Sequence, residues 1–311
     1  MGTTYEILIQ LFVVLLFIFV GARKGGVALG IYGGFGLAIL VFCFHLQPKS
    51  PPIDVMLMII AVITAASTLQ AAGGIDYLIK IAEKLLRVYP PAITIVAPIV
   101  SYLFTFVAGT GHIAYALLPI ISEVSLEAKV RPERPLAVSV IASQQAITAS
   151  PISAATAALL SVIILQHPSI SLSDILLISI PSTLIGVIVH ARAQMSVGVD
   201  LKDDPEYQRR LREGLLASKD NTTAVVLPKG AALAVFIFLL SVITIVLMGS
   251  IDSLRPSWDG VSLGMPQLIE IIMFTASGIM ILLSKTDVAK IASGTIFSSG
   301  MQAVIAIFGI A

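Results

Sequence analysis

Two long apolar segments, each interrupted near its middle, constrain the fold of this chain more than any other feature. They cover residues 92–121 and 136–166. A straight helix crosses the hydrocarbon core of a bilayer with roughly 20 residues, so each segment is about one and a half times as long as a single span requires. Lipid cannot satisfy backbone groups that leave helical geometry, so each break must be buried in protein or line a wet cavity. Paired breaks of this kind are typical of solute transporters, which build a binding site from discontinuous helices.

The composition assigns the chain to the polytopic helical membrane proteins. Hydrophobic residues make up 57% of the chain and charged residues 12%, and the charged fraction of a soluble domain is about twice as high. We therefore predict an all-α polytopic membrane protein. The net charge is +1 and no basic tract is present, so the sequence indicates no nucleic-acid partner. The single cysteine, Cys43, excludes an internal disulfide and a cysteine-based metal cluster.

The other apolar runs predict further membrane spans. Glu6 lies where a cleavable signal would carry basic residues, and Arg23-Lys24 follows the first run, so we expect a retained first span. The predicted spans, besides the two interrupted segments, are residues 5–22, 27–46, 53–72, 174–191, 230–250, 267–283 and 294–311.

Two segments between these runs have a different character. Residues 74–89 carry charged side chains at i, i+3, i+4 and i+7 and apolar side chains on the other side, which predicts a helix in the interface plane of the membrane. Residues 192–229 are polar and too short for an independent domain. We interpret them as a linker between two halves of the chain.

The lysines and arginines predict the topology. If residues 92–121 form a re-entrant hairpin and residues 136–166 a broken but complete span, every lysine and arginine except Lys49 and Arg255 lies on one side. The reverse assignment moves Lys129, Arg131 and Arg134 to the other side. Because basic residues favour the cytoplasmic side, the first arrangement is preferred. It predicts a periplasmic N-terminus and a cytoplasmic linker.

This topology indicates an inverted repeat. Residues 1–191 would form the first repeat: three spans, the interfacial helix, the hairpin, the broken span and a last span. Residues 230–311 would supply the first three spans of a second repeat in the opposite orientation. By symmetry, the second repeat would be incomplete and would lack its hairpin, broken span and last span. The halves share no clear residue-level identity, so a complete but irregular protein is the alternative.

The first break is predicted to bind an anion. Gly109-Thr110-Gly111 can form a tight turn with positive φ and leave backbone N–H groups free. The half-helix beginning near His112 would then point its positive end at this tip, where a carboxylate is stabilised. His112 itself is either a substrate donor or proton site, or an ordinary capping histidine.

The second break contains Ser150-Pro151. Proline lacks an N–H and disfavours helix at the preceding residue, so we expect the helix to restart at Pro151 with an exposed N-terminus. The alternative at either break is simple packing or a kink. Donors and acceptors that we assign to the substrate site around this break are Ser143, Gln144, Thr148, Ser150 and Ser153, with Gln145 beside them.

The predicted spans contain no permanently cationic side chain that could pair with an anionic substrate. No lysine or arginine falls inside a predicted span, so a dianion would be held by hydroxyls, amides and helix ends, by a bound ion, or by a cation elsewhere. Ser150 and His112 are conceivable as a catalytic pair, but the sequence lacks Gly-x-Ser-x-Gly, His-Glu-x-x-His and paired intramembrane aspartates. We therefore expect no enzyme, no catalytic residues, no metal and no cofactor.

At these residues the chain resembles the anaerobic C4-dicarboxylate antiporter family, the Dcu carriers of bacterial inner membranes. The resemblance extends over all 311 residues. It is closest to the branch that exchanges fumarate for succinate and works with a C4-dicarboxylate sensor kinase. The segments that carry the resemblance are residues 21–26, 44–48, 82–87, 109–112, 131–135, 149–151 and 180–186.

The resemblance implies a function and a fold. The family exchanges fumarate, malate or aspartate for succinate, and belongs to an ion-transporter superfamily of inverted repeats with re-entrant hairpins that work as elevators, usually as homodimers in membrane lipid. Arg87 and Arg131 match arginines that matter for transport. Family members continue past the position of Ala311, which agrees with an incomplete second repeat. The alternative is a non-transporting fragment or a regulatory partner of the sensor.

Overall fold

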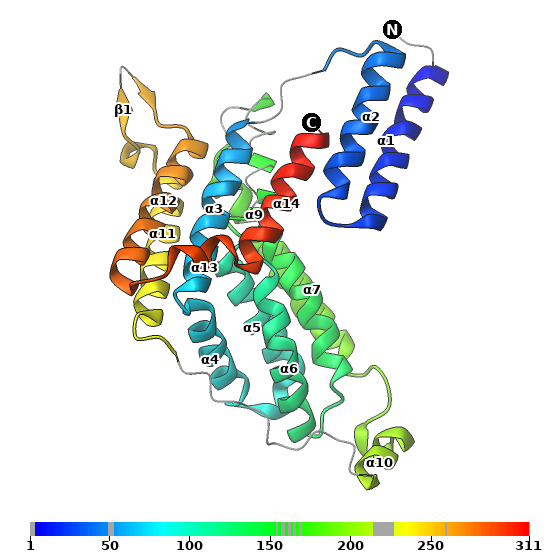
Figure 1. Cartoon of the computed structure of the whole chain (residues 1–311). Helices are drawn as coiled ribbons and strands as arrows, with labels where there is room; N and C mark the ends of the chain where they lie inside the picture. The colour runs from blue at the N-terminus through cyan, green and yellow to red at the C-terminus, as the bar shows by residue number, and fades with distance from the viewer. Residues whose placement is uncertain are drawn as a thin grey trace.

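The computed structural model describes most of the chain as helix (Figure 1). The described residues are 4–48, 53–153, 155–156, 159–160, 163, 166–167, 170–213, 227–258 and 260–310. Within them, five helices are long and apolar enough to cross a membrane, or up to six if a bent pair is one span. The prediction of an all-α polytopic membrane protein is confirmed.

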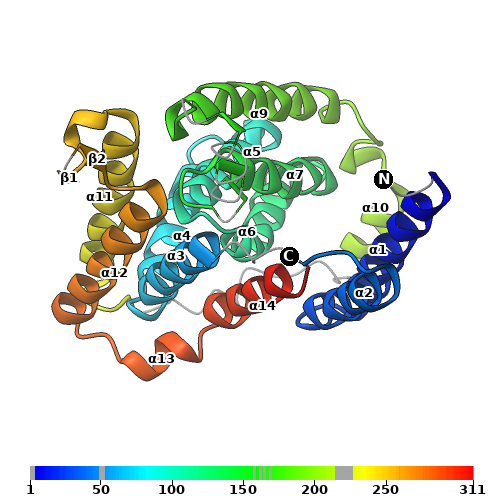
Figure 2. The same cartoon turned by 90° about the horizontal axis from the view of Figure 1, so that it is seen from above.

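Helices α1 (Thr4–Lys24) and α2 (Ala28–Phe44) form an antiparallel pair at one edge of the molecule (Figures 1 and 2). The chain reverses between them at Gly25 and Gly26, which both have positive φ. Helix α2 packs against α14, the last helix. A side chain at Gly30 would meet the backbone of Ile305 and Ala306 at 2.8–3.0 Å, so glycine permits this close approach.

Helices α3 (Ile53–Ala71) and α4 (Gly74–Leu86) are separated by Gly73, whose φ of +77° ends the first helix. Residues Met56–Ala71 are bent by 72° relative to Gly74–Leu86. The buried side of α4 faces α11, α6 and α5, and its apolar members lie at helical spacing: Ile75, Leu78, Ala82 and Leu86. The amphipathic helix predicted at residues 74–89 is therefore present, and its position in the interface plane stays a prediction.

A helical hairpin follows. After the short η1 (Pro90–Ala92), α5 (Ile93–Ala108) runs to a tip at residues 109–111, and α6 (His112–Glu127) returns to the end from which α5 started (Figure 1). The second arm continues beyond the predicted limit at residue 121. Helix α7 (Glu133–Ala149) then runs beside α5 in the same direction and stops at Ser150. The described residues between 155 and 166 are helical, and the remainder of the predicted span at 136–166 lies outside the described residues.

Helix α9 (Leu172–Gln194) begins with a capping box formed by Ser171 and Asp174 and packs against α7 and α5. It is followed by η2 (Leu201–Asp203) and α10 (Pro205–Arg212), so the predicted linker at 192–229 contains helical structure of its own. Residues 214–226 of that linker lie outside the described residues.

The last part of the chain forms three further apolar helices. They are α11 (Ala231–Ser250), α12 (Met265–Ser284) and α14 (Thr295–Ile310), close to the predicted spans. Between α11 and α12 lie η4 (Asp252–Leu254) and an antiparallel pair of short strands, β1 (Ser257–Trp258) and β2 (Val261–Ser262). Helix α13 (Val288–Ala292) connects α12 to α14. The strands and α13 were not predicted.

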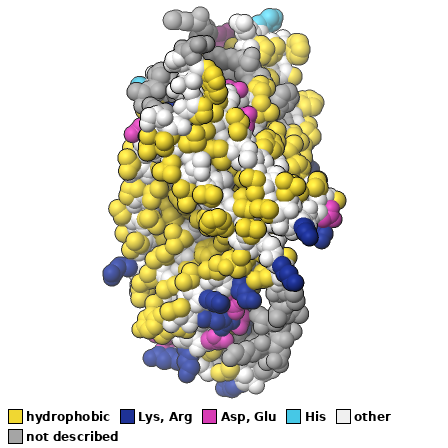
Figure 3. Space-filling model, turned by 90° about the vertical axis from the view of Figure 1, so that its left-hand side faces the viewer, with side chains coloured by type: hydrophobic (Ala, Val, Ile, Leu, Met, Phe, Trp, Pro, Cys, Tyr) yellow, Lys and Arg dark blue, Asp and Glu magenta, His cyan; other side chains and the backbone are white. Residues whose placement is uncertain are grey.

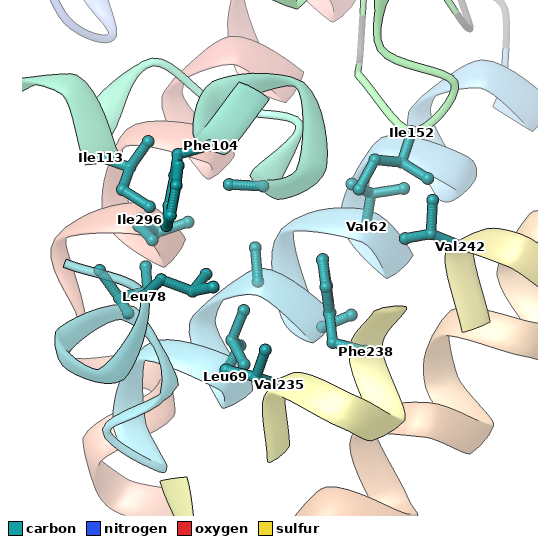
Figure 4. Packing of buried hydrophobic residues seen from close by; sticks show 14 of the residues in the cluster. Val62, Leu69, Leu78, Phe104, Ile113, Ile152, Val235, Phe238, Val242 and Ile296 are labelled. Atoms are coloured by element: carbon teal, nitrogen blue, oxygen red, sulfur yellow. The ribbon is translucent and has the colours of Figure 1, made fainter. Parts of the chain in front are cut away.

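The buried apolar core centres on α3. Phe104 and Ile113 of the hairpin lie near Ile296 of α14, and Val62 of α3 lies near Ile152 and Val242 (Figure 4). Figure 3 shows hydrophobic side chains over most of one face, with lysines and arginines gathered towards its lower end. This surface suits a protein whose middle faces lipid.

Candidate functional site

The tip of the hairpin is a three-residue turn. Gly109 has φ of +66°, and its N–H donates to the Thr105 carbonyl at 2.9 Å, which closes α5. Gly111 has helical φ and ψ and immediately precedes α6. Only glycine adopts positive φ without a steric penalty, so the predicted turn is confirmed at Gly109.

The break after α7 differs from the prediction at Pro151. Ser150 is extended, with φ of −76° and ψ of 130°, and residues 151–153 form a turn. Helix resumes only after Ser153, whose Oγ accepts from the Thr156 N–H at 3.1 Å. The prediction of an exposed helix N-terminus at Pro151 is wrong, because the Ser150 hydroxyl, which would cap a helix starting at Pro151, donates to the Phe106 carbonyl, and Ser153 caps the later helix instead.

The tip and the break lie against each other. The Ser150 hydroxyl donates to the Phe106 carbonyl in the last turn of α5 at 2.7 Å. A Cβ on Gly109 would lie 2.8 Å from Ile152 Cγ1, and one on Gly111 would lie 3.4 Å from Gln144 Nε2. The structure therefore brings together two predicted groups of site residues that are about 40 positions apart in the sequence.

The hydroxyls assigned to substrate are mostly used by the protein itself. Ser143, Ser150 and Ser153 are buried, and Pro151 with them. Ser143 donates to the Val140 carbonyl at 2.8 Å, and Thr148, although exposed, donates to the Gln145 carbonyl at 2.7 Å. In this conformation the hydroxyls of Ser143, Thr148 and Ser150 donate to main-chain carbonyls and stabilise the backbone around the break.

Three predicted residues near the tip are not fully buried. Thr110 and Gly111 are half-buried, and Gln144 is exposed on α7 close to Gly111. His112 begins α6, and its side chain lies outside the described part of the structure.

A cavity of about 200 Å³ opens beside the tip. Ala108, Gly109 and Thr110 line one side of it, and helices α3 and α14 line the others. Sequence reasoning missed these two helices, although the small residues within the last apolar run mark a close helix contact that could have indicated α14. The additional lining residues are Ile59, Val62, Ile63 and Ala66 of α3 and Ile296, Ser299 and Gly300 of α14.

Arg87 lies away from the tip, at the C-terminal end of α4. Its guanidinium pairs with Glu83 at 3.1 Å and with Glu123 and Glu127 of α6 at 2.8 Å each. The hydrogen bond with Glu123 is the largest cause of a raised pKa for Arg87, ahead of the opposing effect of burial. Arg87 therefore joins α4 to the base of the hairpin.

Arg131 and Arg134 hold the segment after α9. Arg131 Nη1 lies 3.0 Å from Asp204 Oδ2 and also donates to the Val199 carbonyl. Arg134 pairs with Asp200 at 2.9 Å and donates to the carbonyls of residues 197 and 198. Both arginines thus attach the start of the linker to the start of α7, and the predicted transport roles of Arg87 and Arg131 stay predictions.

An apolar helical bundle with a hairpin tip set against a broken helix defines a polytopic membrane protein of the transporter class. Residues 6–311 match the family described as anaerobic C4-dicarboxylate membrane transporter. The chain belongs to this family, and the resemblance to Dcu carriers is confirmed.

Curated relatives agree with this assignment. The chain is 44% identical over 311 residues to the anaerobic C4-dicarboxylate transporter DcuB of Escherichia coli O6:H1, covering 97% of this chain and 70% of that protein. It is 41% identical to the C4-dicarboxylate transporter DcuA of Escherichia coli K12, with 98% and 70% covered. Identity to DcuA of Wolinella succinogenes is 39%, with 97% and 69% covered. These relatives are transporters and not enzymes. No solved structure matches the chain.

Proposed function

We propose that this protein is a secondary antiporter of the bacterial inner membrane that exchanges C4-dicarboxylates, with fumarate, malate or aspartate entering and succinate leaving. Its family membership supports this proposal. The observation that carries it is the hairpin tip, at which Gly109 and Thr110 line a cavity of about 200 Å³ next to the break in α7.

The chemistry of the tip suits a carboxylate. The first N–H groups of a helix have no intrahelical acceptor, and the helix dipole places partial positive charge there. Helix α6 starts at His112, so these groups gather at the tip. One carboxylate of the substrate would bind near Thr110, Gly111 and His112, with Gln144 as a side-chain donor. The apolar side chains of α3 would contact the carbon backbone of the substrate.

The proposed transport cycle has the hairpin and the broken helix moving together, because Ser150 and Ile152 tie them to each other. They would move against α2, α3 and the corresponding helices of the second half. In this proposal the N-terminus is periplasmic, the segment after α9 is cytoplasmic, and the protein forms a homodimer that also contacts a C4-dicarboxylate sensor kinase.

Counterflow in proteoliposomes tests the function. Succinate-loaded vesicles carrying the protein should accumulate labelled fumarate, and Thr110→Val should reduce this uptake severalfold without lowering the amount inserted. Thr244→Val is the matched control, since Thr244 is an exposed hydroxyl on α11 that donates to its own helix at Leu240. Absence of fumarate accumulation by the unmodified protein would rule out the proposed exchange.

A further inference from the structure

Three carboxylates converge on one guanidinium at the base of the hairpin. This base cluster consists of Glu83 of α4, Arg87 directly after α4, and Glu123 and Glu127 of α6. Each nitrogen of the Arg87 guanidinium donates a hydrogen bond to a different carboxylate: Nε to Glu83, Nη2 to Glu123 and Nη1 to Glu127. The planar fork of the guanidinium fixes all three directions at once.

The cluster stabilises a contact that would otherwise be repulsive. Glu123 and Glu127 lie four residues apart on one helix, where like charges oppose each other. Glu83 lies on the facing helix and adds a third negative charge. Arg87 lies between them, so it screens the repulsion and links α4 to α6 through two 2.8 Å contacts.

Solvent screens this cluster only in part. The side chain of Arg87 is 32% exposed, and those of its glutamate partners are 33–36% exposed. A single exposed ion pair contributes little, but a network on one guanidinium with good geometry holds its partners in place. The base cluster is therefore able to fix the lower end of α6.

The base cluster is too far from the tip to bind a ligand there. Glu123 follows His112 by eleven residues, which corresponds to about 17 Å along the helix. Arg87 pairs with that end of α6, at the end of the molecule where α5 begins and α6 ends (Figure 1). Any effect of these side chains on a substrate at the tip must be transmitted through α6.

From this geometry we propose that Glu123 and Glu127 are positioning residues for transport, which act with Arg87 by clamping α6 to α4. Helix α4 is anchored in the core through its contacts with α11 and α5. In this conformation, a clamp at the lower end of α6 therefore sets where Thr110 and Gly111 lie relative to α3 and α14. The inference rests on the proposed exchange function, and it adds two carboxylates that do not touch substrate.

The first test is the kinetics of exchange in proteoliposomes. Glu123→Gln combined with Glu127→Gln should lower the maximum exchange rate at least fivefold, while the KM for succinate changes less than twofold, because the substrate contacts are intact. Glu213→Gln is the matched control, since Glu213 pairs with Arg209 on α10, outside the hairpin, and should leave both parameters unchanged. An unchanged rate in the double variant would overturn the proposal.

A charge exchange separates positioning from substrate binding. Arg87→Glu alone should lower the maximum rate strongly, and adding Glu123→Arg should restore at least a third of it, because the cluster regains a cation between carboxylates. A guanidinium that bound substrate would instead give a KM raised more than tenfold with no rescue, and this result would also overturn the proposal.

A third measurement does not depend on transport. Amide hydrogen exchange of residues 112–127 in the detergent-purified protein should become faster in the Glu123→Gln and Glu127→Gln variants. It should return towards the rate of the unmodified protein in the variant that combines Arg87→Glu with Glu123→Arg. If the unmodified protein fails to exchange dicarboxylates but the variants show these changes in hydrogen exchange, the transport proposal fails while the clamp stands. Unchanged hydrogen exchange would refute the clamp itself.

Discussion

Helices α1 and α5 are both apolar, yet they occupy opposite environments. Within the most apolar stretch of α1 only 6% of the residues are buried, whereas 56% are buried in the corresponding stretch of Pro90–Ala108. Helix α1 packs mainly on α2, while α5 packs on α7, α6, α9 and α4. Apolarity alone therefore does not say whether a membrane helix faces lipid or protein.

Small polar side chains distinguish the two helices. Thr94, Ser101 and Thr105 of α5 are buried, and α5 packs on α7, whose buried residues are similarly small, such as Ser139 and Ala142. Small residues allow helix backbones to approach closely in lipid, where no hydrophobic effect drives association. Helix α1 instead exposes large aliphatic and aromatic side chains on most of its surface, namely Leu8, Leu11, Phe12, Leu15 and Phe19.

The largest expected difference between the two regions is at their glycine turns. Gly109→Ala places a methyl group 2.8 Å from Ile152 Cγ1 and also forces alanine into positive φ, which costs about 1–2 kcal/mol before the clash. We expect fumarate uptake to fall about tenfold or more, since tenfold corresponds to about 1.4 kcal/mol.

The matched variant at the other region is Gly25→Ala. Gly25 also has positive φ, +71°, but nothing lies within 4 Å of its added methyl group. Uptake should stay within about twofold of the unmodified protein if the backbone strain is absorbed locally. Equal losses at both turns would show that the contact of the tip with the break has no special role.

A smaller effect is expected at Ser150. Ser150→Ala removes the donor to the Phe106 carbonyl, and loss of a buried hydrogen bond of this kind costs roughly 1–3 kcal/mol. Thermal unfolding in detergent should shift down by roughly 5 °C. Thr244→Ala, which removes an exposed hydroxyl from α11, serves as the control and should shift the midpoint by less than about 1 °C. A Ser150 variant as stable as the control would contradict the proposed tie between hairpin and broken helix.

The smallest effect is expected where α2 meets α14. Gly30→Ala brings a methyl group within 3.0 Å of the backbone of Ala306, so the α1–α2 pair should move away from α14. Because α1 and α2 do not line the cavity described above, uptake should fall by less than about twofold, with a midpoint lower by roughly 2 °C. Gly34→Ala on the same helix has open space and should not destabilise the protein. A tenfold loss of uptake at Gly30 would show that this pair is coupled to the site.

Local chemistry predicted a large part of the fold. The predicted span at 230–250 agrees with α11, and the excess length of the first interrupted segment predicted two helices joined at Gly109. These predictions succeeded because membrane spans depend on run length and composition, which are local properties. The restart at Pro151 was predicted wrongly, because the Ser150 hydroxyl donates to a carbonyl of another helix, and Ser153 instead caps the helix that follows.

The sequence by itself determined that this is a helical membrane protein with two interrupted helices. Lipid cannot satisfy backbone N–H and C=O groups, so apolar spans must be helical, and glycine and proline mark where the helices are interrupted. The tertiary structure decided which groups meet: Ser150 with Phe106, Thr110 with α3 and α14, and Arg87 with Glu123 and Glu127. These partners are 36 or more positions apart along the chain, so their pairing depends on how the helices pack and leaves no signal in local periodicity.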